Sequence, residues 1–511
     1  MEKLLKQVMK LLERFLGSFS AALTYADVVI LPGYLKKDKK KDISTVLCKD
    51  RDGHDFILKK PLISAAMDTV TEADMAITMA REGGLGVIHG NLTPEEQAKQ
   101  VKKAKRAENL MIATPVFVNG KTTIGKVAKL IKEQGFSSIP VLDDDRKILG
   151  LAMNPSVRFQ EKNYHKPITT TMGKNFIKIK LSDVQNKEKE IDLEKAKQIF
   201  AKNTQKISKA LLIADDNNIL KGLITSKDVE NLKTFPDASK DSKGRLRVAA
   251  AISTAKNTMK RVRLLVEAGV DMLVIDSSHG HSDFMADTIK AIKAEFPTMP
   301  VVGGNVVTAK GALFLAKAGA DIIKVGVGPG AICTTRKISG VGLPQFSAII
   351  DVCEALKEEY PHIAIIADGG IKYSGDIGKA IVAGATAVMM GSAFSGTDES
   401  PGEVILRNGI KVKIYRGMGS TAAQKDGDGK RYEQNGKTPI SHGIVSYVPY
   451  KGTVTDIIDV SAGGLGETMT LTGATNLAEL QNAEWRQITT AGEIESHPHG
   501  VQLVHEEPNY K

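Results

Sequence analysis

Short apolar runs alternate with amphipathic stretches over most of the chain. Most of the runs are continuously apolar rather than alternating, which is typical of parallel strands covered on both faces. The predicted strands are residues 62–66, 85–88, 247–252, 272–276, 301–304, 322–325, 363–367 and 387–390. Helical patterns lie between them at 71–82, 254–268, 282–296, 308–318, 345–360 and 374–383. Eight strands alternating with helices predict a (β/α)₈ TIM barrel. A Rossmann fold is the competing interpretation, but no Gly-x-Gly-x-x-Gly opens a helix after the first strand.

A repeated segment separates the second predicted strand from the third. Residues 138–151 and 210–223 each place an apolar strand before an acidic turn and a second strand, with a period of about 72 residues. One copy cannot bury its own apolar face, so we expect the two copies to pack together as one inserted module. We predict that residues 1–112 form the first part of the barrel, 113–236 the module, and 237–511 the rest of the barrel.

Composition and charge narrow the classes of protein. With 42% hydrophobic and 25% charged residues the chain is globular, and no apolar run reaches the roughly 18 residues that span a membrane. Three cysteines cannot form a disulfide framework, which favours a reducing compartment. The net charge is +11, and residues 113–236 supply +8 of it through 22 Lys and Arg against 14 Asp and Glu. This excess suits anionic partners or a merely solvated surface; without interleaved aromatic residues it does not favour nucleic acid.

The N-terminal residues 4–19 have apolar positions at helical spacing with lysines and an arginine between them. They fit either a targeting presequence or a surface helix that docks onto the fold. Glu2 and Glu13 are atypical of a presequence, so we predict a docking helix and a cytoplasmic protein.

In a barrel of this kind the functional residues lie on the loops after the C-terminal strand ends. Cys333 follows the sixth predicted strand, in a glycine-dense loop beside Arg336, whose charge would favour the thiolate. We therefore predict that Cys333 is a catalytic nucleophile. Cys353, within an apolar helical pattern, and Cys48 are expected to pack in the core instead.

Glycine-rich elements follow the seventh and eighth strands, and a third lies at residues 415–420. Such loops bind phosphate through backbone N–H groups, and Asp368 at the seventh strand end could bind sugar hydroxyls. Together at one barrel mouth they predict a nucleoside monophosphate site. Residues 276–279 offer polar groups without a metal-ligand pattern, and the polar stretch 424–438 is typical of a mobile lid.

These motifs resemble those of the inosine monophosphate (IMP) dehydrogenase family, a TIM barrel that carries a pair of CBS modules. The motifs are residues 64–70, 275–281, 303–307, 328–336, 340–345, 367–370 and 415–420. The resemblance runs from about residue 23 to near the C-terminus, and the cysteine loop is its most diagnostic part.

The resemblance implies a reaction. Cys333 would attack carbon 2 of the hypoxanthine ring, a hydride would pass from that carbon to NAD⁺, and water would hydrolyse the covalent thioimidate to xanthosine monophosphate (XMP). Arg431 and Tyr432, on a mobile flap, would activate the water, and Thr335 would orient it. An arginine base needs a dry, preorganised site because its pKa exceeds about 12.

The resemblance also implies ligand contacts. Asp368 would bind the ribose. The phosphate would lie at Gly370, Gly391, Ser392 and Tyr415. The base would lie among Met67, Gly417, Met418, Gly419 and His442. NAD would contact Asp276, Ser277, Ser278, Asn305 and Gly326. A potassium ion would bind carbonyls of Gly328, Gly330 and Cys333, completed by Glu495, Ser496 and His497 from the next subunit of a homotetramer.

The CBS pair of the family suggests adenine or guanine nucleotide binding and assembly of tetramers into octamers. Residues 225–228 keep the family's ribose-binding pattern, whereas the first copy, at 153–156, lacks it. The chain departs from the family elsewhere too. Ala331 stands where Ser is usual, and His442 stands where Glu or Gln is usual; a neutral His can relay protons near pH 7.

Two alternatives remain. Guanosine monophosphate (GMP) reductase shares the barrel and the cysteine loop but deaminates its substrate with NADPH; residues 275–281 and the Arg431–Tyr432 pair favour the dehydrogenase. The second alternative is a regulatory nucleotide- or nucleic-acid-binding protein built on a decayed barrel. Cys333, Thr335, Asp368 and Arg431 argue against decay.

Overall fold

The fold is described from a computed structural model of the chain. It describes residues 21–502 except 36, 38–39, 109–110, 113–114, 187–190, 204–209, 256 and 427–439, and it leaves out the side chains of 193, 232 and 426. The described residues form two compact units. One consists of Lys105–Pro236 with Lys240–Leu246, and the other holds the remaining described residues. The predicted docking helix at 4–19 lies outside the described residues.

The larger unit is a closed barrel of parallel strands, as predicted. Neighbouring strands follow the order β12-β13-β14-β15-β16-β17-β4-β5. Their bounds are β4 (Leu62–Ser64), β5 (Leu85–Ile88), β12 (Ala249–Ile252), β13 (Met272–Asp276), β14 (Val301–Val306), β15 (Ile322–Val325), β16 (Ala364–Asp368) and β17 (Ala387–Met390). The bounds of β5, β13, β15 and β17 are those predicted from the apolar runs. The predicted (β/α)₈ fold class is therefore confirmed.

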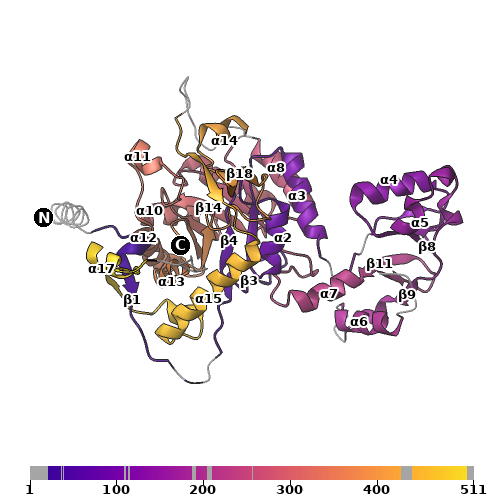
Figure 1. The fold of residues 1–511 in the computed structure, drawn as a ribbon, viewed down its shortest axis with the longest axis horizontal. Helices are drawn as coiled ribbons and strands as arrows, with labels where there is room; N and C mark the ends of the chain where they lie inside the picture. Colours follow the sequence, from indigo (N-terminus) through magenta and orange to yellow (C-terminus); the bar gives the residue numbers. More distant parts are fainter. Residues whose placement is uncertain are drawn as a thin grey trace. The chain divides into compact units, whose positions relative to one another are not determined.

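Amphipathic helices surround these strands (Figure 1). They are α2 (Ala73–Arg81), α3 (Pro94–Arg106), α8 (Thr258–Ala268), α9 (Asp283–Glu295), α10 (Ala309–Ala318), α12 (Gln345–Glu359), α13 (Ser374–Val382) and α15 (Val454–Thr472). In α12, Phe346, Ile349 and Leu356 recur at helical spacing and are buried. The main apolar core therefore lies between the strands and this layer of helices.

A hairpin closes the N-terminal end of the barrel interior. It consists of β2 (Thr45–Lys49) and β3 (Asp55–Leu58), and its buried Leu47, Phe56 and Leu58 join the first residues of several barrel strands in one apolar cluster. Arg247 lies over the Phe56 ring at 4.2 Å and pairs with Asp50 at 2.8 Å. Because this end is filled, the barrel interior opens toward the C-terminal strand ends.

Smaller elements complete the larger unit. The turn η1 (Tyr25–Asp27) leads into β1 (Val28–Ile30), which pairs with β21 (Trp485–Gln487). The strands β18 (Ile405–Arg407) and β19 (Ile410–Arg416) form a hairpin, and β20 (Val445–Pro449) adds a third strand that the sequence analysis did not predict. The short helices are α11 (Thr335–Ser339), α14 (Thr421–Asp426), α16 (Leu477–Leu480) and α17 (Thr490–Glu495).

The smaller unit holds both copies of the repeat. The first copy has β6 (Val118–Asn119), α4 (Ile124–Gln134), β7 (Ser138–Leu142), β8 (Ile148–Met153) and α5 (Asn154–Arg158). The short turns η2 (Glu161–Asn163) and η3 (Ile168–Thr170) follow. The second has β9 (Ile177–Lys180), η4 (Leu181–Val184), α6 (Leu193–Lys202), β10 (Ala210–Ala214), β11 (Leu220–Thr225) and α7 (Ser226–Thr234). Within this unit α4 lies with α5, and α6 with α7 (Figure 1).

The two copies pack together, as the repeat predicted. Ile148 N–H donates to the Asn218 carbonyl at 3.1 Å, and Leu220 N–H donates to the Arg146 carbonyl at 3.4 Å. Arg146 and Asn218 hold equivalent left-handed positions in the two turns, with φ of 63° and 65°. This unit begins at Lys105, and the domain bounds placed at 112/113 and 236/237 stay a prediction. Among the described helices of the whole chain, none is long and apolar enough to cross a membrane.

Candidate active site

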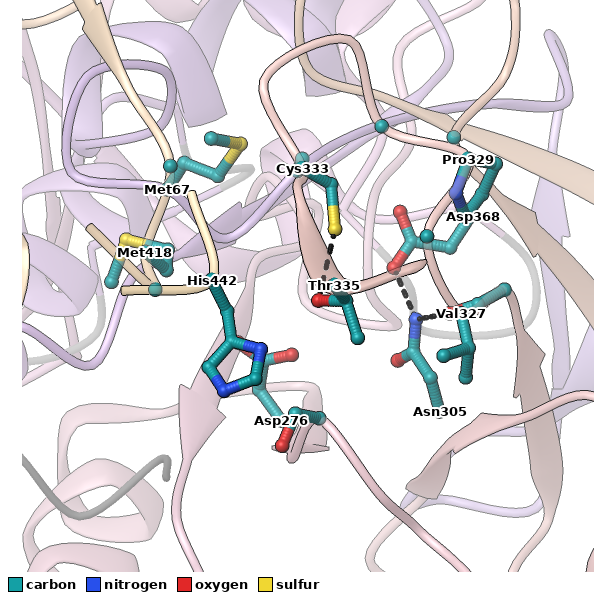
Figure 2. Close-up of a pocket in the computed structure, with 18 of the residues that line it drawn as sticks. Met67, Asp276, Asn305, Val327, Pro329, Cys333, Thr335, Asp368, Met418 and His442 are labelled. Carbon is teal, nitrogen blue, oxygen red and sulfur yellow. Dashed lines mark hydrogen bonds between the residues drawn. The ribbon is translucent and has the colours of Figure 1, made fainter. Parts of the chain in front are cut away.

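A cavity of about 840 Å³, partly open to solvent, lies at the C-terminal ends of the barrel strands. The last residues of several barrel strands, the loops that follow β4, β13, β15 and β16, and residues 415–419 and 442 supply its lining (Figure 2). Most of the residues singled out from the sequence meet here: Met67, Asp276, Ser277, Ser278, Asn305, Gly326, Gly328, Gly330, Cys333, Thr335, Asp368, Tyr415, Gly417, Met418, Gly419 and His442.

Cys333 faces this cavity from the loop after β15. Its Sγ lies 3.2 Å from the Thr335 hydroxyl, and in Figure 2 the two methionines Met67 and Met418 lie on one side of it and Asp368 on the other. The Cys333 N–H donates to the Gly330 carbonyl at 3.0 Å. The thiol is thus held at the edge of an open space, as a nucleophile requires.

Residues 442–444 run beside the cysteine loop. Thr334 N–H donates to the His442 carbonyl at 3.1 Å, and Ile444 N–H donates to the Ile332 carbonyl at 3.1 Å. His442 N–H in turn donates to the Gly419 carbonyl at 2.9 Å. These backbone bonds bring His442 into the cavity with Cys333.

The cysteine loop needs glycine at two places. A Cβ on Gly326 would lie 2.3 Å from the carbonyl oxygen of Asp368, and one on Gly328, at φ +88°, would lie 2.4 Å from Cγ of Arg336. The Arg336 side chain fills the inside of the loop, where its guanidinium donates to the carbonyls of Val327 and Leu343. The pKa of Arg336 lies below its ordinary value because the guanidinium is partly buried. The neighbouring Cys333 opposes this shift but is the smaller effect.

A buried lysine that the sequence analysis missed lies at the centre of the site. Lys324, on β15, is 2% exposed. Its ammonium donates to Asp368 at 2.8 Å and to Asp276 at 3.3 Å, and it also contacts the Asn305 amide oxygen. The Asn305 amide donates to Asp368 at 2.9 Å and to the Gly326 carbonyl at 2.7 Å. The available signal was a lysine inside an otherwise apolar predicted strand.

Tyr415 and Met67 lie together on another wall of the cavity. Burial raises the pKa of Tyr415, with a smaller contribution from Asp368, so its hydroxyl stays protonated. This hydroxyl lies 3.8 Å from the Met67 sulfur. A Cβ on Gly391 would lie 2.9 Å from the same hydroxyl and 3.1 Å from the sulfur, which places Gly391 directly behind these two side chains.

An ion pair ties the loops on this wall together. Arg416 donates to Asp68 at 2.7 Å, and the Asn91 amide donates to the same carboxylate at 2.8 Å. Asp68 follows Met67, and Arg416 precedes Gly417. The pair therefore fixes the methionine loop against the glycine-rich segment that carries Met418.

Comparison with known proteins identifies the family. The family model described as IMP dehydrogenase / GMP reductase domain matches residues 22–499. The chain belongs to this family. It is 45% identical over 493 residues to an inosine-5'-monophosphate dehydrogenase of Aquifex aeolicus, covering 96% of this chain and 97% of that protein. It is 44% identical over 501 residues to a protein of the same name from Chlorobaculum tepidum, and the match covers 96% of this chain and 98% of that protein.

A solved structure of the IMP dehydrogenase / GMP reductase family also matches the fold. The GMP reductase C318A of Trypanosoma brucei, in complex with guanosine 5'-monophosphate, superposes with a TM-score of 0.84 at 33% identity, covering 95% of this chain and 99% of that one. The predicted membership in the family is thus confirmed, and relatives of both names resemble the chain.

Some residues expected from the IMP dehydrogenase resemblance do not line the cavity. Gly370, Gly391, Ser392 and Glu495 are absent from its lining. Gly370 instead lines a neighbouring cavity of about 1360 Å³ together with Gly328, Glu493, Ser496 and His497 of the same chain. The flap residues Arg431 and Tyr432 lie outside the described residues.

Among the described residues no group of three or more His, Cys, Asp or Glu side chains is placed to hold a metal ion.

Proposed function

We propose that the protein oxidises IMP to XMP with NAD⁺, through a covalent intermediate on Cys333, in guanine nucleotide synthesis. The observation that carries this proposal is the Cys333 thiol, which faces a cavity shared with Thr335, Asp368 and Tyr415. The relatives named inosine-5'-monophosphate dehydrogenase, at 42–45% identity over 96% of the chain, support the same reaction.

In the first half of the reaction the Cys333 sulfur attacks carbon 2 of the hypoxanthine ring. The thiol proton leaves to solvent as the carbon–sulfur bond forms, and the Thr335 hydroxyl, 3.2 Å from the sulfur, can relay it. NAD⁺, when bound, supplies the acceptor for the hydride that leaves carbon 2. Covalent catalysis of this kind splits one difficult oxidation into two easier steps.

In the second half water attacks carbon 2 and the carbon–sulfur bond breaks. The electron pair and one proton of the water return to sulfur, the other proton of the water stays on the purine ring, and XMP leaves. The two halves together release one proton. His442 lines the cavity where this water would enter, and a neutral imidazole can accept such a proton near pH 7. Thr335 would orient the water. We propose that Arg431 and Tyr432 contribute from the flap.

The polar wall of the cavity suits the nicotinamide part of NAD⁺. Asp276, Ser277, Ser278 and Asn305 line it, and the Lys324 ammonium pairs with both Asp276 and Asp368, offsetting one of their two negative charges. Hydroxyl, amide and ammonium groups can together bind a carboxamide and a ribose. Asp368, which already accepts from Asn305 and Lys324, keeps further lone pairs for the ribose hydroxyls of the substrate.

A potassium ion would bind near the cysteine loop. Carbonyl oxygens are the ligands that a potassium ion prefers. Gly328 lines both cavities, but the Gly330 carbonyl already accepts the Cys333 N–H, so the loop supplies only part of a coordination shell. We propose that Glu495, Ser496 and His497 of a neighbouring subunit complete it in a homotetramer.

GMP reductase is the second candidate, favoured by the fold match to the Trypanosoma brucei enzyme. The test measures NADH absorbance with IMP, NAD⁺ and potassium, beside NADPH consumption with GMP. We expect sustained NADH formation that is lost in Cys333→Ala. NADPH consumption with GMP and no NADH from IMP would overturn the dehydrogenase. A single stoichiometric burst of NADH would place the fault in hydrolysis and point to His442 or the flap.

A further inference from the structure

The loop after β17 is held by a lysine that no part of the proposed reaction uses. Lys451 follows β20, and its ammonium donates to the carbonyls of Ser392 at 2.5 Å and Ala393 at 3.1 Å. Its backbone N–H donates to the Gly396 carbonyl at 2.9 Å. One residue thus bonds the loop at three points.

The same loop is folded into a tight turn where Lys451 reaches it. The Ser395 N–H donates to the Gly391 carbonyl at 2.9 Å, and the Ser395 hydroxyl donates to the Ser392 carbonyl at 2.8 Å. The Ser392 carbonyl therefore accepts from both an ammonium and a hydroxyl. Hydrogen bonds to a carbonyl polarise its peptide group. The N–H of the peptide between Ser392 and Ala393, which belongs to Ala393, therefore becomes a stronger donor.

A second lysine holds the far end of the loop. Lys413, on β19, is 3% exposed, and its ammonium donates to the carbonyls of Thr397 at 2.8 Å and Ser400 at 2.6 Å. Tyr415 lies two residues further along the same strand and thus on the same face. The strand that supplies Tyr415 to the cavity therefore also fixes the loop.

The held turn lies next to the substrate cavity. Gly391 is behind Tyr415 and Met67, as the 2.9 Å and 3.1 Å approaches of a Cβ at this position show. On its other side Lys451 and Ala393 line a separate cavity of about 1160 Å³. The turn therefore lies between the Tyr415–Met67 wall of the substrate cavity and the second cavity, where Lys451 holds it.

We propose that Lys451 is a positioning residue for the 5'-phosphate of the nucleotide substrate. It holds the Gly391–Ala393 turn so that its N–H groups point at the phosphate, and it adds a positive charge behind them. The proposal deepens the proposed function, because it takes the ligand to be a purine nucleoside monophosphate.

The test separates recognition of the phosphate from recognition of the base. The dissociation constants of IMP and of inosine, which lacks the phosphate, are measured for wild type, Lys451→Met, Lys451→Gln and Lys451→Arg. The matched control is Lys411→Met, which removes an exposed cation from β19. The Lys411 ammonium lies 5.8 Å from the Tyr450 ring centre.

We expect Lys451→Met to weaken IMP binding by about tenfold or more, as for loss of a charge-assisted hydrogen bond, and to change inosine binding less than about twofold. Lys451→Arg should recover part of the loss. Equal losses for IMP and inosine, or no loss for IMP, would overturn the proposal. If Lys451→Met does not fold, as judged by its melting temperature, the same criteria apply to Lys451→Gln.

This outcome is independent of turnover. If the wild type forms no NADH from IMP, the proposed function fails, and the same titrations with GMP and guanosine still decide the role of Lys451. If NADH forms normally and the IMP-to-inosine difference is absent, only the role of Lys451 fails.

Discussion

The three cysteines lie in environments that predict different reactivity. Burial raises the pKa of the Cys48 thiol to about 12, and burial also raises the pKa of Cys353. Cys333 instead faces the open cavity. Because the thiolate is the nucleophilic form, a raised pKa means less reactive thiol at any given pH.

We predict that iodoacetamide at pH 8 alkylates Cys333 and leaves Cys48 and Cys353 intact in the folded protein. A pKa of about 12 in place of the ordinary 9.0 leaves Cys48 with roughly one thousandth of the thiolate of an unperturbed cysteine at this pH. Peptide mass spectrometry locates the modification, and added IMP should slow it. Alkylation of Cys48 at a similar rate would contradict the buried environment described for it.

Lys324 is the residue on which the electrostatics of the site depend. Lys324→Met would leave Asp276 and Asp368 close together without the cation between them. Removing one partner of a buried ion pair typically costs about 3–5 kcal/mol. We predict a loss of that order in the free energy of unfolding and a raised KM for NAD⁺. Lys317→Met, which removes an exposed lysine of α10, is the control. Equal unfolding curves for wild type and Lys324→Met would refute the role.

Among the site residues, the sequence identified those beyond the predicted strand ends better than the one within a predicted strand. Cys333, Thr335, Asp368 and Asn305 could be predicted to meet because the C-terminal ends of parallel strands and the loops after them converge at one end of a barrel. Lys324 could not, because a lysine within an apolar run is consistent with a strand end or a surface position. Only the closed barrel shows that its side chain points inward to two carboxylates.

Among the elements, the loop after β15 is the most tightly constrained. We predict that Gly326→Ala lowers stability by about 1–3 kcal/mol and activity by about tenfold or more. Its Cβ would lie 2.3 Å from the Asp368 carbonyl and would displace Asp368, whose carboxylate we propose binds the substrate ribose. Chemical unfolding and NADH formation measure the two effects.

The matched control for this substitution lies in a helix. Gly463, in α15, is exposed, and a Cβ there has no atom within 4 Å. Gly463→Ala should raise stability by about 0.5–1 kcal/mol through helix propensity and leave activity unchanged. If Gly326→Ala were as well tolerated as Gly463→Ala, that result would contradict the close approach of Gly326 to the Asp368 backbone.

The barrel strands could be predicted because both of their faces are buried, which leaves a continuous apolar run. The sheet of β18, β19 and β20 gave a weaker signal. In β20 every residue is at least partly exposed, and apolar residues such as Val445 and Tyr447 point outward, so neither alternation nor a continuous run marks the strand. The loop contacts of Lys451 depend on this sheet, which is why sequence analysis could not find them.

For the whole molecule, the repeat of about 72 residues correctly predicted two packed copies of one motif. What each copy binds is a separate matter. In the second copy the Asp228 carboxylate accepts one hydrogen bond from the Thr225 hydroxyl at 2.5 Å and another from the Thr225 backbone N–H at 3.1 Å. These two bonds close the N-terminal cap of α7. A nucleotide ribose would have to share this carboxylate.

We predict that ATP or GTP binds the smaller unit and raises the melting temperature of the protein, since a ligand that binds only the folded state stabilises it. Asp228→Asn should reduce the shift. The control is the same titration with adenosine or guanosine, which lack the phosphates. Melting temperatures that do not change with ATP or GTP would contradict nucleotide binding at this unit.

The proposed reaction depends on a covalent bond between the Cys333 sulfur and carbon 2 of the purine ring. The most direct measurement is acid quenching of the protein during turnover of labelled IMP with NAD⁺, followed by trypsin and peptide mass spectrometry. Cleavage after Lys324 and Arg336 isolates Cys333 as the only cysteine in residues 325–336. We expect a labelled purine nucleotide on this peptide, formed together with NADH. Formation of NADH without any adduct on this peptide, or with the label on another peptide, would contradict it.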